Sequence, residues 1–110
     1  MTKVKFLADE NGIYGFEISG HCSVNGDDEV GKTVCAAVSS AAYMTVNTVT
    51  DIIGDKADVT VDDAVMKFYA KSPCECTKKL LKGLRFHITE LADQYKDNIS
   101  VNGGAKNVKD

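Results

Sequence analysis

The fold is decided first by the stretch VKFLADENGIYGFEI, residues 4–18. Apolar and polar residues alternate on both sides of Asn11-Gly12, a dipeptide typical of tight β-turns. A three-residue loop over 10–12 sets like residues opposite one another: Val4 with Ile18, Phe6 with Phe16, and Lys5 with Glu17. A two-residue loop would mix the two faces, because a one-residue slip exchanges them. We therefore predict a β-hairpin with a three-residue loop and a left-handed Gly12.

A long helix is predicted over residues 32–53, where apolar and small residues recur at helical spacing. Its predicted buried face comprises Val34, Val38, Ala41, Thr45, Val49 and Ile52. Gly54 follows directly, and a glycine at this position is typical of a helix end. Residues 57–61 and 64–71 alternate around Asp62-Asp63. That alternation predicts a second pair of strands.

A second helix is predicted to begin at Ser72-Pro73-Cys74-Glu75. Ser72 would be the N-cap, Pro73 the first helical residue, and Glu75 the second half of a capping box. The predicted buried stripe comprises Leu80, Leu84, Ile88, Leu91 and Tyr95. Gly83 inside this helix suggests close packing, since glycine costs helix stability. A last short strand is predicted around residues 99–101.

These elements follow the order strand, strand, helix, strand, strand, helix, strand. The order predicts an α+β fold, a two-layer sandwich of about five mixed or antiparallel strands with two helices on one face. We expect a single domain over residues 1–103 and a loose tail over 104–110. The order of strands within the sheet does not follow from this pattern.

The composition excludes several classes of protein. The chain has 110 residues, of which 44% are apolar, and a formal net charge of −3. This apolar content excludes intrinsic disorder, and the acidic balance disfavours nucleic-acid binding through bulk charge. No apolar run is long enough for a membrane span, and residues 1–6 lack the apolar core of a signal peptide. We therefore expect a cytoplasmic protein with four reduced cysteines.

Residues 26–33, GDDEVGKT, match the phosphate-binding P-loop pattern GxxxxGK[ST]. Three acidic residues stand where a polyanion would have to bind, and like charges repel at close range. The preceding strand belongs to a hairpin, whereas a P-loop joins a strand of a parallel sheet directly to its helix. No later apolar strand ends in an aspartate that could hold magnesium. We therefore interpret the match as a polar loop that leads into a helix.

Cys35 and His21 have the residue types that thiol catalysis needs, a nucleophile and a base. If Thr33 is the N-cap, Cys35 is the second helical residue. There the helix dipole would lower its pKa, and free N–H groups could hold an oxyanion. Ser39, one turn later, would share its face. Most buried cysteines are nevertheless simple apolar residues.

We interpret the other cysteines and the second histidine as structural or surface residues. Cys74 and Cys76 also lie at a predicted helix start, but their i, i+2 spacing points them to different sides. His87 lies too far along that helix to act as a base for Cys76, and we expect a packed or surface histidine. Cys22 and His21 could share a zinc ion, yet no third and fourth ligands stand out.

Two segments together resemble the ribosomal-processing cysteine proteases of the Prp family. They are Ser19-Gly20-His21 and Val34-Cys35-Ala36-Ala37-Val38-Ser39. The order of elements and the acidic loop between the two segments fit as well. The specific part of the resemblance covers residues 19–49.

The resemblance implies a cytoplasmic, homodimeric cysteine endopeptidase without metal or cofactor. It would remove a short N-terminal extension from a large-subunit ribosomal protein precursor, cleaving after an aromatic pair. His21 would be the base and Cys35 the nucleophile. Gly20, Ser39, Asp27 and Asp28 are the candidates for supporting roles.

Three alternatives to the protease hypothesis stay open at this point. The first is a non-catalytic, ribosome-associated binding protein that docks through the basic cluster Lys78, Lys79, Lys82 and Arg85, which could equally be a solvated helix face. The second is a nucleotide-binding protein that uses the P-loop-like segment. The third is a redox role in which Cys35 forms a reversible disulfide, with Cys22 as the expected partner.

Overall fold

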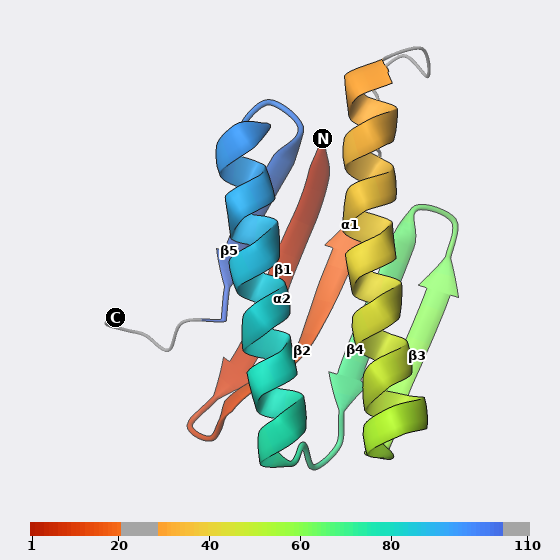
Figure 1. Ribbon diagram of the computed structural model, residues 1–110, viewed down its shortest axis with the longest axis vertical. Helices are drawn as coiled ribbons and strands as arrows, with labels where there is room; N and C mark the ends of the chain where they lie inside the picture. The colour runs from red at the N-terminus through yellow and green to blue at the C-terminus, as the bar shows by residue number, and fades with distance from the viewer. Residues whose placement is uncertain (21–28, 105–110) are drawn as a thin grey trace.

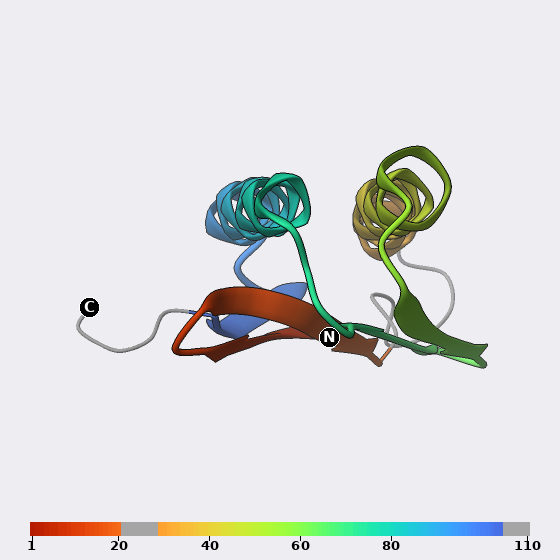
Figure 2. The same ribbon diagram turned by 90° about the horizontal axis from the view of Figure 1, so that it is seen from below.

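The computed structural model describes residues 1–20 and 29–104. The elements, in chain order, are β1 (Thr2–Asp9), β2 (Gly12–Ser19), α1 (Glu29–Asn47), the π-helical turn η1 (Thr48–Ile53), β3 (Ala57–Asp62), β4 (Val65–Ala70), α2 (Glu75–Gln94) and β5 (Ile99–Gly103). The strands form one sheet in the order β3-β4-β2-β1-β5. Both helices lie on the same face of this sheet (Figures 1 and 2). The predicted α+β sandwich is confirmed.

The sheet is mixed because its last strand runs parallel to its first. β5 pairs with β1 in parallel, whereas β1–β2, β2–β4 and β3–β4 are antiparallel. The strand that precedes the P-loop-like segment is β2, and it is antiparallel to both neighbours. The parallel strand–loop–helix unit of a P-loop is therefore not formed there.

The first hairpin has the predicted register, but its turn differs. Val4 pairs with Ile18, Phe6 with Phe16, and Lys5 with Glu17. The strands nevertheless meet at a two-residue turn, since Asp9 pairs with Gly12. The register shifts by one between Leu7 and Ala8 of β1, because Leu7 pairs with Gly15 and Ala8 with Ile13, which leaves Tyr14 of β2 as the extra residue of a bulge. This extra residue therefore lies inside β2 and not in the loop. A bulge bends its strand and increases the local twist. Gly12 has the expected positive φ, at 117°.

The first helix starts earlier than predicted and ends in a wider turn. α1 begins at Glu29 instead of Lys32, so Thr33 is not its N-cap. Gly54 ends the helical run with a left-handed φ of 88°, as expected, and its N–H donates to the Val49 carbonyl five residues back. Such i→i+5 bonds add residues to each turn. Ile52 is therefore rotated out of the predicted buried face and is 80% exposed.

The second helix has a different cap from the predicted one. α2 begins at Glu75, and its N-cap is Cys74 instead of Ser72. The Asp55 carboxylate, 19 residues earlier in the chain, accepts the Cys74 N–H at 2.9 Å and the Thr77 hydroxyl at 2.6 Å. A partner from the loop between η1 and β3 has thus replaced the local capping box. Gly83 is exposed and a Cβ there would have no atom within 4 Å, so the expected close packing is absent.

The second pair of strands differs from expectation at its turn. β4 begins at Val65, because Ala64 adopts a left-handed φ of 61° and belongs to the turn. β3 extends to Asp62. Met66, Phe68 and Ala70 are buried, as their alternation predicted. The late strand around residues 99–101 is also confirmed.

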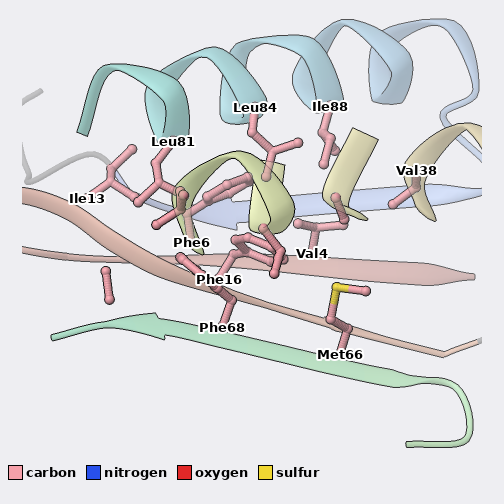
Figure 3. Packing of buried hydrophobic residues seen from close by; sticks show 14 of the residues in the cluster. Val4, Phe6, Ile13, Phe16, Val38, Met66, Phe68, Leu81, Leu84 and Ile88 are labelled. Atoms are coloured by element: carbon pink, nitrogen blue, oxygen red, sulfur yellow. The ribbon is translucent and has the colours of Figure 1, made fainter. Parts of the chain in front are cut away.

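The core lies between the sheet and the two helices (Figure 3). Phe6, Phe16 and Phe68 come from adjacent strands, and their ring centroids are 6.1 Å and 5.4 Å apart. From α2, the side chains of Leu81, Leu84 and Ile88 are buried against them. The predicted stripe missed Leu81, whereas Leu80, Leu91 and Tyr95 are partly buried at the core margin. In the part of the chain described here, neither helix is long and apolar enough to cross a membrane.

Candidate active site

A pocket of about 280 Å³ opens between α1 and the sheet, and Cys35 lies in its wall. Helical spacing places four residues of α1 along this pocket: Cys35, Val38, Ser39 and Tyr43. Cys35 is partly buried and also packs against the core. The sequence therefore placed Cys35 and Ser39 on one face correctly.

The remaining walls come from the ends of four strands, β1, β2, β3 and β4, and from the β3–β4 turn. Apart from Gly20, which follows β2, these residues are Thr2, Ile18, Val61, Asp62, Ala64, Val65 and Met66. Most of them are apolar, so the pocket has a mainly apolar wall with the thiol of Cys35 and the hydroxyl of Ser39 on one side. Such a lining suits an apolar side chain beside a reactive group.

Gly20 is held at the pocket by main-chain contacts. Its N–H donates to the carbonyl of Ala64 at 3.1 Å. Its φ is 90°, and a Cβ there would lie 2.5 Å from the Met1 carbonyl oxygen, so no larger residue fits without a shift. Gly20 directly precedes His21 in the sequence. The predicted site residues His21, Asp27 and Asp28 lie outside the described residues, as does Cys22.

The position of Cys35 in its helix corrects one part of the predicted mechanism. Because α1 begins at Glu29, Cys35 is its seventh residue instead of its second. The unpaired N–H groups of a helix belong to its first turn. The argument that the helix start activates Cys35 and holds the oxyanion is therefore wrong.

The other candidate residues lie away from the pocket. Cys74 and Cys76 are exposed at the start of α2, and His87 is an exposed residue of the same helix, as expected for a surface histidine. The thiol of Cys74 contacts the Thr77 hydroxyl at 3.7 Å. Among residues 1–20 and 29–104, no group of three or more histidine, cysteine or acidic side chains is placed to bind a metal.

The basic cluster is partly engaged within the molecule. Lys78 forms an ion pair with Glu75 at 3.3 Å, and the Arg85 Nε–H donates to the Gly103 carbonyl at 3.0 Å. Lys79 and Lys82 are exposed. In the P-loop-like segment, Lys32 pairs with Glu29 at 3.8 Å within the first turns of α1. Neither the basic cluster nor the Lys32–Glu29 pair lines the Cys35 pocket.

The sequence reasoning missed several residues of this pocket. Tyr43 could have been found, because it follows Ser39 by four residues on the same helix. Val61, Ala64 and Met66 could not, since they reach Cys35 only through the order of strands in the sheet.

Comparison with known proteins decides the family. The sequence profile described as Cysteine protease Prp matches residues 1–100. The chain belongs to the cysteine protease Prp family. It is thus a cysteine protease by class, and the resemblance predicted from its Gly-His and Val-Cys segments is confirmed at the level of the family. No curated protein sequence matches the chain.

Solved structures share the fold of this Prp family member at low sequence identity. A Staphylococcus aureus ribosomal processing protease Prp with a covalently linked product peptide has a TM-score of 0.82 and 18% identity. The same protein with a substrate peptide has a TM-score of 0.83 and 16% identity. Each comparison covers 94% of this chain and 99% of the other. A Streptococcus mutans protein has a TM-score of 0.80 and 20% identity, over 94% and 93% of the two chains.

Proposed function

We propose that this cysteine protease removes a short N-terminal extension from a large-subunit ribosomal protein precursor, with Cys35 as nucleophile and His21 as base. The observation that carries the proposal is the position of Cys35. Of the three cysteines that the structure describes, it is the one that lines the pocket beneath α1, whereas Cys74 and Cys76 are exposed on α2. Gly20 lines the same pocket and directly precedes His21 in the sequence.

The proposed reaction proceeds in two steps. His21 takes the proton of the Cys35 thiol, and the thiolate attacks the scissile carbonyl carbon. The C–N bond then breaks, His21 protonates the leaving amine, and a thioester remains on Cys35. A water molecule, deprotonated by His21, hydrolyses this thioester and restores the thiol. Ser39 supplies a hydroxyl to the same pocket, and Asp27 and Asp28 are the other candidates for a supporting role.

Two observations support a peptide as substrate. The Staphylococcus aureus proteins with this fold are ribosomal processing proteases that hold product and substrate peptides. In this chain, Ile18, Val38 and Met66 form an apolar wall beside Cys35. That wall suits the aromatic pair after which cleavage is expected. A cytoplasmic homodimer belongs to the same proposal, and sedimentation of the purified protein tests its dimeric state.

Intact mass spectrometry of the ribosomal protein precursor tests the proposal. The precursor of the source organism is incubated with wild-type protein, Cys35→Ala and Cys76→Ala. We expect Cys35→Ala to leave the precursor whole, because it removes the proposed nucleophile. Wild type and Cys76→Ala should both remove the extension, because the Cys76 thiol is exposed on α2, away from the pocket.

The histidines provide a second matched pair. We expect His21→Gln to lower kcat/KM by about 100-fold or more, the usual contribution of a general base. His87→Gln should retain wild-type activity. A precursor that stays whole with unoxidised wild-type protein would contradict the proposal and favour the non-catalytic binding protein.

A further inference from the structure

β3 forms one edge of the sheet and has an open side. It pairs only with β4 in the described structure, and no other element lies beyond it (Figures 1 and 2). Five of its six residues are exposed, and only Ala57 is partly covered. An edge strand presents unpaired N–H and C=O groups at every second residue, which makes it a template for another extended chain.

The helix-facing side of β3 is apolar and incompletely covered. Val59 and Val61 pair with the buried Phe68 and Met66, so they face the helix layer. They remain 42% and 54% exposed. Tyr43 of α1, which is 44% exposed, lines the Cys35 pocket together with Val61. An apolar strip thus runs from that pocket along β3.

The opposite side of the same strand is acidic. Asp58, Thr60 and Asp62 alternate with the valines and are all exposed. Asp58 pairs with the exposed Lys71 at 3.5 Å, and Asp62 accepts the N–H of Asp63 at 2.7 Å. A chain laid along this edge would therefore meet apolar groups on one side and carboxylates on the other.

Within residues 1–20 and 29–104, only one of the two sheet edges reaches the proposed nucleophile. Val61 and Asp62, at the end of β3, line the pocket that contains Cys35. None of the residues of β5, the other edge strand, lines it. The free edge of β3 is therefore continuous with the site.

We propose that β3 binds the substrate as an added strand whose apolar side chains face Val59 and Val61 and whose alternate, basic side chains face Asp58 and Asp62. This inference rests on the proposed function and adds to it the binding surface and the charge pattern of the substrate. The six residues of β3 span roughly 20 Å. About six substrate residues on one side of the scissile bond would pair with it, main-chain bonds giving affinity and side chains specificity.

The test uses Cys35→Ala protein and a fluorescent peptide that spans the cleavage site of the precursor. Each peptide residue in turn is N-methylated at its main-chain nitrogen, and Kd is measured by fluorescence anisotropy. We expect methylation at every second residue to weaken binding at least tenfold, because those N–H groups donate to β3. Methylation at the intervening residues should change Kd less than twofold.

A second arm tests the charge pattern with variants that keep the fold. Asp58→Asn with Asp62→Asn should weaken binding several-fold and reduce its salt dependence, because the basic side chains of the peptide lose their partners. The fold should be kept, because both carboxylates are exposed and belong to no core contact. Glu90→Gln with Asp93→Asn makes the same charge change on the exposed side of α2. This control should leave Kd unchanged.

The outcomes separate this inference from the proposed function. Cleavage by wild-type protein without an alternating methylation pattern would overturn the added strand alone. An alternating effect of methylation on Kd, without cleavage by wild-type protein, would support the added strand. It would contradict the proposal that this precursor is the protease's substrate. Absence of both binding and cleavage would overturn both.

Discussion

Gly83 lies on the exposed side of α2, where a Cβ would meet no atom within 4 Å. Its φ is not positive, so alanine fits without strain. Glycine costs a helix interior about 1 kcal/mol relative to alanine. We expect Gly83→Ala to stabilise the protein by up to about 1 kcal/mol, raising Tm by about 5 °C. Thermal unfolding followed by circular dichroism measures this change.

Gly15 is the matched control for that prediction. It is buried in β2, and a Cβ there would lie 2.3 Å from the Phe68 carbonyl oxygen. Gly15→Ala should therefore lower stability, by roughly 1–3 kcal/mol for a crowded site. Equal shifts of Tm in both variants would contradict the distinction between the two sites.

Asp55, which caps the start of α2, makes the stability of the fold depend on pH. The Thr77 hydroxyl and then the Cys74 N–H hold the pKa of this carboxyl below its ordinary value of 3.8. A lowered pKa stabilises the fold above the ordinary value, and that contribution is lost as pH falls through the folded-state value. We expect Asp55→Asn to lower Tm at pH 7, and the difference from wild type to shrink below about pH 4.

The exposed Asp97 is the control for the pH series. Asp97→Asn should follow the wild-type Tm across the series. A constant Tm difference between Asp55→Asn and wild type down to pH 2 would show that the charge of Asp55 plays no part in the cap.

At the scale of the element, η1 separates two residues that a regular helix would bury together. Val49 is fully buried, whereas Ile52 is 80% exposed. We expect Val49→Ala to cost on the order of 2 kcal/mol, the range for a core truncation. Ile52→Ala should stay within about 0.5 kcal/mol of wild type. Urea unfolding compares the two, and a similar loss in both would indicate that the helix stays regular to its end.

Element types and one register were predictable from the sequence, but element ends were not. The alternation of Val4, Phe6, Phe16 and Ile18 determined their pairing, because a slip would expose the core face. The bulge could not be predicted, because it lies nearer the turn and leaves the alternation of these four residues intact. The cap of α2 could not be predicted because Asp55 lies in the loop before β3, 19 residues away in the sequence.

The candidate site was predictable along one helix and no further. Cys35 and Ser39 share a face of α1 by spacing alone. Val61, Asp62 and Met66 join them because β4 lies between β2 and β3, an order that residue patterns did not determine. The exposed edge of β3 depends on the same order, so it could be recognised only in the structure.

At the scale of the whole molecule, the last strand completes the sheet. β5 pairs with β1, and Ile99 is only 3% exposed. We expect a chain that ends at residue 104 to keep the Tm and cleavage activity of the full protein. A chain that ends at residue 98 should lose cooperative unfolding, because β1 loses a neighbour and the core loses Ile99. Calorimetry of both chains, with a full-length control, measures this difference.

The pairing of the first strand with the last has a consequence for synthesis. Thr2 lies opposite Ile99, so one side of β1 stays open until the residues of β5 have left the ribosome. The β1–β2 hairpin can form early from local contacts, but its outer edge is then a template for pairing with other chains. The emergence of β5 closes that edge, which makes it the step that protects the nascent hairpin from pairing with other chains.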